Sequence, residues 1–432
     1  MSGLEIRWPD AAAERVRAAQ GRLTRAGEAL RERSLTDRIA AVARVLDDWT
    51  KPDSPWRREL IEAFSQTSAF DHGTIAEGLE SALRAWQPAH LRAAAERELA
   101  CVLAAADGSP PRRALAPFDW TAVLAGGTIP MPTLLSSLLP LVLGSPVLLR
   151  ESSKDPVTGS LLARSLAERD SDLARAFEPI EFPTDDADAF ASLLGAPCVV
   201  ATGSDETMQA IAARLRPEQR FVAYGHRVSI AVLGPATPSD RDAIARELAL
   251  DVARWDQTGC LSPIAGYLVG LGDDDCAAFA RAMADALESL SKTMPRGELP
   301  VSARALLSAE RADARMRAAS GRAALFERTD AVVVLESRAG AGPAPLHRFL
   351  RLFPLPSLAG LPAALTALGA PLSNVAVAGF AANERAGLDP ILERFGASRV
   401  TVPGRLQTPP IDWPRDGQPL FTPLARFVQH SG

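Results

Sequence analysis

The segment from Trp120 to Leu149 constrains the fold most, because it contains no charged residue. Its length and apolar character would allow a membrane-spanning helix. Glycines and prolines interrupt it throughout, at Gly126, Gly127, Pro130, Pro132, Pro140, Gly144 and Pro146. A lipid-exposed helix could not easily satisfy the backbone groups that so many breaks would free. The breaks instead predict a strand over 120–125, a helix over 131–142 and a strand over 146–150, and so no membrane span here.

Both of these strands are continuous apolar runs, which is typical of strands buried on both faces of a parallel sheet. The same alternation continues along the chain. Further strands are expected at 198–202, 230–233, 264–269, 331–335, 349–355 and 374–380. Further helices are expected at 159–168, 205–215, 241–253, 274–290, 301–323 and 359–368. Residues 10–107 have a helical pattern throughout, with helices expected at 36–49, 56–64, 75–86 and 91–105. The order predicts an α/β protein with a helical amino-terminal region.

The size and charge of the chain exclude several classes of protein. At 432 residues and 45.9 kDa, two or three lobes are expected. A net charge of −5, from 47 basic and 52 acidic residues, argues against a nucleic-acid-binding protein, which needs a dominant positive field. The first ten residues lack the basic and then apolar run of a signal peptide, so we expect a cytoplasmic protein with reduced thiols.

The four cysteines are scattered and include no CxxC pair, so we expect no metal site. Cys101, Cys198 and Cys276 are most simply small core residues. Cys260 differs, because it lies in Asp256-Gln257-Thr258-Gly259-Cys260-Leu261-Ser262-Pro263, between a helix and a strand. A glycine there lets the backbone approach a ligand closely. The local context leaves a nucleophile and a core thiol equally open.

Three other segments could bind a phosphate-bearing ligand. Gly203 and Ser204 end a buried strand and begin a helix, where free backbone N–H groups attract a pyrophosphate, although ordinary helix capping would look the same. The turn at Gly126-Gly127-Thr128 follows the first strand, where open α/β sheets place ligands. The run from Arg150 to Asp155 offers two cations and two hydroxyls, or simply a salt-bridged loop. A GxGxxG fingerprint is absent from these turns. His226, beyond a strand, could be a base but is more simply structural.

The succession of these motifs (GGTIP, LLRESS, TGSDET, YGHRVS and DQTGCLSP) resembles the aldehyde dehydrogenase superfamily, and within it the LuxC-type acyl-CoA reductases. The likeness continues to Leu424-Ala425-Arg426-Phe427 and so covers nearly the whole chain. It implies an aldehyde-dehydrogenase-like fold of two Rossmann-like α/β lobes. The expected divisions are a helical region packed on the cofactor lobe (1–110), an NADP-binding lobe (111–235), a catalytic lobe (236–405) and a carboxyl-terminal tail (406–432) that could hold an oligomerisation strand.

The resemblance also implies the chemistry. Cys260 would attack an acyl thioester as a thiolate, and the resulting acyl-enzyme would be reduced to an aldehyde. Gln257 and Thr128 complete the implied catalytic set, with Thr128 in place of the Asn that the superfamily uses in its oxyanion hole. Val222 and Ala223 occupy the region where oxidising relatives carry a Glu that activates water, and the absence of that base suits a reductase.

NADPH is the expected cofactor. Gly127, Gly203 and Ser204 would approach its phosphates, and Arg150 its adenosine ribose. NAD-preferring relatives often carry an acid where this chain has Ser153 followed by Lys154, so a 2′-phosphate would meet donors and positive charge.

Two other functions stay open at this point: an aldehyde-oxidising dehydrogenase, and a catalytically impaired scaffold that binds an acyl-donor partner. The resemblance implies acyl-CoA or an acyl-carrier or acyl-protein as donor, an acyl-protein synthetase as a possible partner, and a homo-oligomer. The acyl chain length and the donor are not specified by the sequence.

Overall fold

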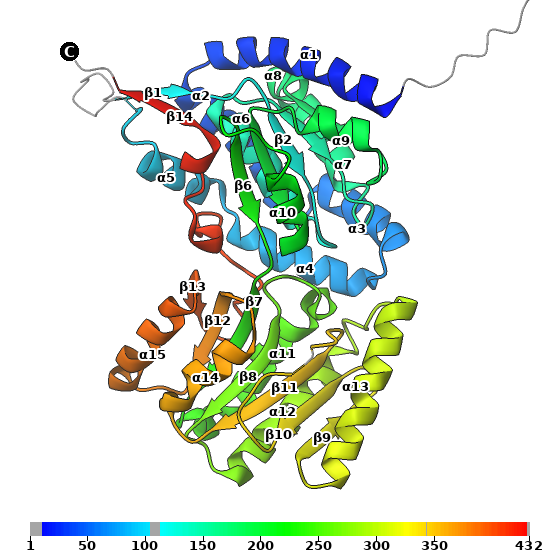
Figure 1. Cartoon of the computed structure of the whole chain (residues 1–432), viewed down its shortest axis with the longest axis vertical. Coiled ribbons are helices and arrows are strands. Elements are labelled where there is room, and N and C mark those ends of the chain that lie inside the picture. The colour runs from blue at the N-terminus through cyan, green and yellow to red at the C-terminus, as the bar shows by residue number, and fades with distance from the viewer. Residues whose placement is uncertain (1–10, 104–112, 343, 430–432) are drawn as a thin grey trace, which may run out of the picture. The chain divides into compact units, whose positions relative to one another are not determined.

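A computed structural model describes residues 11–103, 113–342 and 344–429. The chain divides into two compact units (Figure 1). The first unit contains residues 1–48, 91–225 and 419–432, and the second contains residues 49–90 and 226–418. The expected α/β architecture with two sheet-based lobes is confirmed.

The first unit is built on a five-stranded parallel sheet in the order β4-β3-β2-β5-β6. Its strands are β2 (Thr121–Leu124), β3 (Val147–Arg150), β4 (Phe177–Ile180), β5 (Cys198–Thr202) and β6 (Arg220–Tyr224). Its helices are α1 (Ala12–Glu32), α2 (Leu35–Thr50), α5 (Pro88–Glu98), α6 (Met131–Leu143), α7 (Thr158–Arg169), α8 (Ser171–Arg175), α9 (Ala187–Leu193) and α10 (Asp205–Ala212). The uncharged segment therefore forms the predicted strand, helix and strand, with α6 ended at Gly144, whose φ of 87° suits a left-handed helix cap.

Strand order in this sheet reverses at β2, because β3 and β4 lie on one side of it and β5 and β6 on the other. The carboxyl ends of β2 and β5 are therefore adjacent, and this is where open α/β sheets bind ligands. One face of the sheet packs against α1, α9 and α10 through Val16, Leu193 and Ile211. Leu149 points to the opposite face, toward α7.

The second unit contains a seven-stranded sheet in the order β13-β12-β7-β8-β11-β10-β9, in which only β9 is antiparallel among the described residues. Its strands are β7 (Val228–Leu233), β8 (Pro263–Val269), β9 (Ala323–Glu327), β10 (Val332–Glu336), β11 (Phe349–Leu355), β12 (Leu372–Ala378) and β13 (Arg399–Thr401). Its helices are α3 (Pro55–Thr67), α4 (His72–Ala85), α11 (Arg241–Ala253), α12 (Asp273–Leu290), α13 (Val301–Ala319), α14 (Leu361–Ala367) and α15 (Ala382–Arg394).

Alternating side chains of this sheet fill two cores. Leu233 and Leu352 pack against α11 and α12 on one face. Val232 and Phe353, their neighbours along the strands, pack against α14 and α15 on the other. Burial on both faces explains why the strands are continuous apolar runs in the sequence.

The helical amino-terminal region is divided between the two units, which differs from the expected grouping of residues 1–110 with the cofactor lobe. Local packing explains the difference. A Cβ on Gly78 of α4 would lie 2.4 Å from the Trp255 ring, so α4 is in close contact with the short helix η2 (Arg254–Gln257). Arg254 also donates to Glu77 across 2.9 Å. Residues 49–90 therefore support the segment that leads to Cys260.

The tail is divided as well. Residues 406–418 belong to the second unit. In the first unit, β14 (Arg426–Gln429) pairs antiparallel with β1 (Arg113–Ala116), as Figure 1 shows. Its Val428 side chain is 46% exposed. The expectation that this tail holds an oligomerisation strand stays a prediction.

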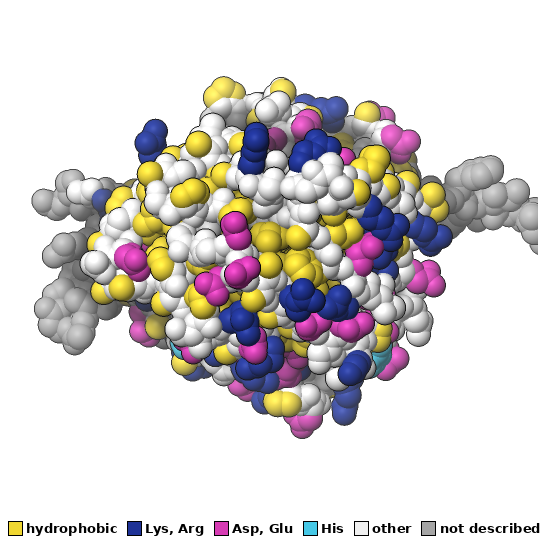
Figure 2. Space-filling model, turned by 90° about the horizontal axis from the view of Figure 1, so that it is seen from below, with side chains coloured by type: hydrophobic (Ala, Val, Ile, Leu, Met, Phe, Trp, Pro, Cys, Tyr) yellow, Lys and Arg dark blue, Asp and Glu magenta, His cyan; other side chains and the backbone are white. Residues whose placement is uncertain are grey.

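The surface mixes charges of both signs. On the face shown in Figure 2, basic and acidic side chains alternate around an apolar centre. None of the helices in the described ranges has both the length and the apolar character needed to cross a membrane.

Candidate active site

The turns after β2 and β5 lie against each other in the first unit. A Cβ on Gly126 would lie only 1.9 Å from the Thr202 carbonyl oxygen, so no larger residue fits there without backbone movement. Gly127 follows with a φ of 95°, a left-handed conformation that favours glycine, and space is open around it. The Ser152 hydroxyl donates to the Gly127 carbonyl oxygen across 3.3 Å. The turn at Gly126 and Gly127 therefore lies beside both the end of β5 and Ser152 of the LLRESS motif.

Ser204 is the N-cap of α10 and accepts a hydrogen bond from the Thr207 N–H across 3.3 Å. Both Gly203 and Ser204 lie at the carboxyl end of β5, and the Ser204 side chain is exposed. Backbone N–H groups in the first turn of such a helix favour a bound anion. Asp205 and Glu206 lie in the same turn and oppose that attraction.

Aromatic rings and hydrogen bonds hold the Arg150 guanidinium in a fixed position. Its guanidinium lies over the rings of Phe182 and Phe190, at 5.5 and 5.3 Å from their centroids. It also donates to the Phe182 carbonyl oxygen across 3.2 Å and to the Thr184 hydroxyl across 2.8 Å. Burial lowers the pKa of Arg150 from its usual value. These contacts fix the position of the arginine at the end of β3.

Ser153 and Lys154 are exposed on the same turn, and within the described part of the chain their side chains have no hydrogen-bond or ion-pair partner. Asp155, on the same turn, is buried, and its carboxyl accepts from the N–H of Thr158, the first residue of α7, across 3.1 Å. Glu151 is also buried and accepts from the Ser160 N–H across 3.2 Å. Its burial raises the pKa of Glu151 to about 7, although the hydrogen bond from Ser160 opposes the rise. The buried carboxyl groups of Asp155 and Glu151 therefore hold this turn in place, and its exposed part carries the Ser153 hydroxyl and the Lys154 ammonium.

Cys260 is exposed at the tip of a turn whose neighbours are held in place by hydrogen bonds. The Ser262 N–H donates to the Gly259 carbonyl oxygen across 3.0 Å, and the Ser229 hydroxyl donates to the Cys260 carbonyl oxygen across 3.2 Å. Gln407 donates to the Ser262 hydroxyl and, across 3.3 Å, to the carbonyl oxygen of Asp251. The turn is thus tied to β7, to α11 and to the segment after β13.

The surroundings of Cys260 control its ionisation. The side chain reaches solvent, yet the protein atoms around it exclude enough water to raise the pKa of the Cys260 thiol. The positive charge of Arg415 opposes this rise and the negative charge of Asp416 adds to it. The Cys260 backbone N–H, directed at its own sulfur, also lowers the pKa. By contrast, Cys198 is fully buried, and burial raises the pKa of its thiol to about 12.

Gln257 is buried and its amide is fully occupied by backbone groups. Its Nε2 donates to the carbonyl oxygens of Pro263, across 2.9 Å, and of Phe349, across 3.1 Å. Its Oε1 accepts from the Phe349 N–H across 2.9 Å. Gln257 therefore joins the turn to the first residues of β8 and β11. Such an amide positions the backbone and has no donor left for a substrate.

The remaining expected residues lie as follows. Thr128 is half-buried in the turn after β2, in the first unit, whereas Cys260 belongs to the second. Val222 and Ala223 lie in β6, and Val222 is buried. Cys276 is buried, as expected for a core thiol, and Cys101 is half-buried.

The Cys260 turn lies at the amino end of its sheet. Pro263, the first residue of β8, pairs with Ser229 near the start of β7, and Arg351 of β11 pairs with Ala265. Ligand sites of open α/β sheets are usually found at the opposite, carboxyl ends. Ser229 and Gln407 hold the turn, and neither was assigned a role from the sequence. Ser229 lies in the YGHRVS motif, which indicated only the family, and Gln407 lies in a loop outside every motif.

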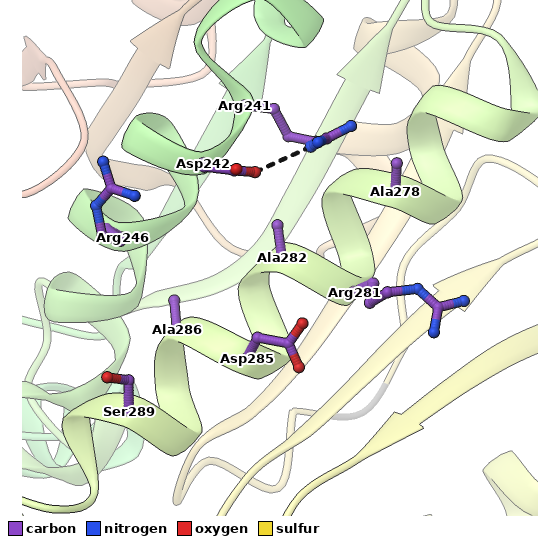
Figure 3. A pocket seen from close by; sticks show the side chains of 9 residues that line it. All are labelled: Arg241, Asp242, Arg246, Ala278, Arg281, Ala282, Asp285, Ala286 and Ser289. Atoms are coloured by element: carbon purple, nitrogen blue, oxygen red, sulfur yellow. Dashed lines mark hydrogen bonds and ion pairs between the residues drawn. The ribbon is translucent and has the colours of Figure 1, made fainter.

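A separate groove of about 490 Å³ lies between α11 and α12 (Figure 3). Small side chains such as Ala282 and Ala286 line it, with charged groups at its rim. Arg241 pairs with Asp242 across 3.0 Å, and Asp285 accepts from Arg328. Its lining residues include no cysteine or histidine, and their charges largely neutralise one another. Across the described ranges, no group of three metal-ligating side chains could hold a metal ion.

Comparisons with known proteins identify the family of the chain. Residues 30–429 match the family model described as acyl-CoA reductase (LuxC). A curated relative, the long-chain acyl-protein thioester reductase of Aliivibrio fischeri, is 24% identical over 178 residues. The match covers 40% of this chain and 36% of the relative, so it spans about a third of that protein's length.

Solved structures of similar fold are aldehyde dehydrogenases. Aldehyde dehydrogenase 21 of Physcomitrella patens superposes with a TM-score of 0.75 at 12% identity, covering 98% of this chain and 92% of its own. An NAD-dependent benzaldehyde dehydrogenase of Corynebacterium glutamicum gives 0.73 at 14% identity, covering 97% and 90%. An NADP-dependent glyceraldehyde-3-phosphate dehydrogenase of Bacillus halodurans gives 0.70 at 11%, covering 96% and 90%. At these identities the likeness establishes the fold and confirms the expected fold class.

Proposed function

Because the chain belongs to the LuxC family of acyl-CoA reductases, we propose that it reduces an activated fatty acid, as acyl-CoA or another acyl thioester, to the aldehyde. The reaction proceeds through an acyl-enzyme on Cys260 and uses NADPH. The observation that carries the proposal is that Cys260 is an exposed residue on a turn that hydrogen bonds hold on both sides.

The chemistry assigned to the chain begins at Cys260. Its thiolate forms a bond to the thioester carbonyl carbon, the bond from that carbon to the donor's sulfur breaks, and the departing thiolate takes up the proton. The tetrahedral oxyanion formed on the way needs hydrogen-bond donors. The Cys260 backbone N–H, which already faces the sulfur, is one candidate, and the Thr128 hydroxyl is the other. NADPH, when bound, supplies the hydride that reduces the acyl group to the aldehyde level.

The first unit has residues that fit such a cofactor. The close approach at Gly126 leaves backbone rather than side chain at the adjacent ends of β2 and β5, and the space around Gly127 is open. Gly203 and Ser204 would meet the pyrophosphate at the start of α10, and Arg150 lies at the end of β3 beside the ribose position that the superfamily implies. Ser153 and Lys154 offer donors without partners to a 2′-phosphate, which supports NADPH over NADH.

The absence of a carboxylate at Val222 and Ala223 favours reduction over aldehyde oxidation. Oxidation requires water to attack the acyl-enzyme, and a base must activate that water. Val222 is buried and neither side chain can accept a proton. The acyl-enzyme would therefore survive long enough to be reduced.

The proposal also includes the acyl donor, a partner enzyme, the cellular location and the oligomeric state. Acyl-CoA, an acyl-carrier or an acyl-protein would deliver the acyl group, and an acyl-protein synthetase could act beforehand. We expect a cytoplasmic homo-oligomer.

Acylation of Cys260 tests the proposal directly. The purified protein is mixed with a radiolabelled long-chain acyl-CoA without coenzyme, and the acyl adduct is located by peptide mass spectrometry. We expect one acyl group on Cys260, lost in Cys260→Ala and retained in the control Cys101→Ser, since Cys101 is the other cysteine that solvent reaches. Addition of NADPH should release aldehyde. A folded protein that takes no label would support the scaffold alternative and refute the reductase.

A further inference from the structure

Two segments with left-handed backbone conformation lie before β8 and β11 of the second unit. Trp255, Asp256 and Gln257 have φ values of 53°, 46° and 63°. Leu346, His347 and Arg348 have φ values of 63°, 55° and 68°. These residues all carry a Cβ, which disfavours the left-handed region, so such backbone persists only where the surrounding structure holds it. The first segment ends three residues before Cys260, and the second ends where β11 begins.

A buried ion pair joins the two segments. Arg348 Nε donates to Asp256 Oδ1 across 2.9 Å, and Arg348 Nη2 lies 2.7 Å from the same oxygen. The Arg348 side chain is 0% exposed and that of Asp256 is 4% exposed. Both charges are thus removed from water, which is costly unless the partners are well fixed.

Further hydrogen bonds fix this pair. Asp256 Oδ2 accepts from the Gly297 N–H across 2.9 Å, and Arg348 Nη1 donates to the Ser291 hydroxyl across 3.2 Å. Gln257, the next residue, bonds both backbone groups of Phe349. Asp256 and Gln257 of the first segment therefore bind two consecutive residues, Arg348 at the end of the second segment and Phe349 directly after it.

An apolar pair of similar size would fill this space at no charge cost, so packing alone does not explain the pair. The ion pair, unlike an apolar pair, also fixes how the two segments are oriented toward each other. A carboxylate that accepts from Arg348 and Gly297 at once fixes the rotation of the Asp256 backbone, and through it the path of the chain to Cys260.

We propose that Asp256 and Arg348 form a clasp that holds the left-handed backbone before Cys260 and so sets the direction in which the sulfur is presented to the acyl donor. Both are positioning residues, because neither reaches the solvent-exposed tip of the turn. The proposal rests on the proposed function of Cys260 as the nucleophile.

The test uses Asp256→Asn and Arg348→Lys in a Cys101→Ser background. The matched control is Arg351→Lys, because Arg351 of β11 is also a buried arginine, at 3% exposed, and its ion pairs are with Glu336 of β10 and Glu310 of α13. Three quantities are measured: the single-turnover rate of Cys260 acylation over a range of acyl-CoA concentrations, the rate of Cys260 alkylation by iodoacetamide as a function of pH, and the melting temperature.

We expect both clasp variants to acylate at least tenfold more slowly at saturating acyl-CoA, with the half-saturating concentration little changed. Alkylation of Cys260 near neutral pH should become faster. Burial by the surrounding protein raises the pKa of the thiol, and a relaxed turn would admit water and so lower that pKa. Arg351→Lys should lose a similar amount of thermal stability and keep the wild-type rates. A merely structural defect would also expose the buried Cys198 and Cys276 to iodoacetamide, so faster alkylation confined to Cys260, located by peptide mass spectrometry, separates the clasp from partial unfolding.

Equal acylation rates in the clasp variants and the control would overturn the proposal. If a clasp variant does not fold, Ser291→Ala removes one bond to Arg348 and should slow acylation two- to fivefold; an unchanged rate would refute the clasp. If the wild-type protein is not acylated at all, the proposed function fails, and an unshifted alkylation profile in the variants would then reject the clasp separately.

Discussion

Ser229, near the start of β7, donates its hydroxyl hydrogen to the carbonyl oxygen of Cys260 across 3.2 Å, although 31 residues separate them in the chain. The same hydroxyl oxygen accepts from the Asn374 N–H of β12 across 3.3 Å. One small side chain therefore connects the Cys260 turn to two neighbouring strands of its sheet.

Ser229→Ala should remove this connection while leaving the thiol in place. We expect a loss of about 1 kcal/mol in the free energy of unfolding, typical of one buried hydrogen bond. The turnover number for acyl-CoA reduction should fall about three- to tenfold with little change in KM, because the sulfur is less well oriented. Ser165→Ala is the control. Ser165 is buried in α7 of the first unit, and its hydroxyl donates to the carbonyl oxygen of Leu162 in the same helix. An equal loss of turnover in the control would contradict the prediction.

Lys154→Ala should weaken the preference for NADPH. The exposed ammonium, without a partner in the described residues, is placed to meet a 2′-phosphate, and a charged hydrogen bond contributes about 1.5–3 kcal/mol. We expect kcat/KM for NADPH to fall about tenfold while the value for NADH changes less than twofold. Lys292→Ala, at another exposed lysine, should change neither. A parallel fall for both coenzymes would show that Lys154 does not recognise the phosphate.

Gly126→Ala should disrupt coenzyme binding. The new Cβ would lie 1.9 Å from the Thr202 carbonyl oxygen, so the turns after β2 and β5 must separate. We expect about 1–3 kcal/mol of destabilisation and at least tenfold weaker NADPH binding by fluorescence titration. Gly272→Ala has no atom within 4 Å of the added Cβ and a φ of −73°, so it should have neither effect. Normal NADPH binding by a folded Gly126→Ala protein would remove this turn from the coenzyme site.

Glu151 should make stability depend on pH. Burial raises the pKa of its folded-state carboxyl to about 7, above the unfolded value near 4.3. The folded state therefore holds the proton more tightly, and the stability that this group contributes below pH 4 is lost as the pH rises toward 7.

Glu151→Gln keeps an oxygen that can accept from Ser160 and removes the titration. Between pH 4.3 and 7 the free energy of unfolding should fall about 1–3 kcal/mol more in the wild type than in the variant. Urea titrations at several pH values give this difference, and parallel pH curves for the two proteins would contradict it.

Much of the fold could be predicted because burial on both faces of a strand gives continuous apolar runs. The strand over 349–355 and the helix over 241–253 have the expected bounds. The strands β4, β6 and β13 were not expected. Burial is mixed along β4 and β6, β13 has only three residues, all half-buried, and β4 contains Pro179, so their sequences lack the apolar run.

The site could be predicted only where its residues are local. The turn around Cys260 and the exposed Ser153 and Lys154 follow from short motifs. Arg348 lies 92 residues from Asp256, and Gln407 lies 145 residues from Ser262. Partners at such separations meet only through the strand order of the sheet, which no local pattern specifies.

The location of the Cys260 turn at the amino ends of its strands leaves the opposite edge of that sheet unused by the proposed chemistry. The strand β8 has seven residues and ends at Val269, so the loop after it begins about 20 Å from the nucleophile turn. A fluorescent tag or a fused protein attached at Gly272, where an added Cβ meets no atom within 4 Å, would therefore leave the thiol undisturbed, which makes this loop suitable for labelling the protein.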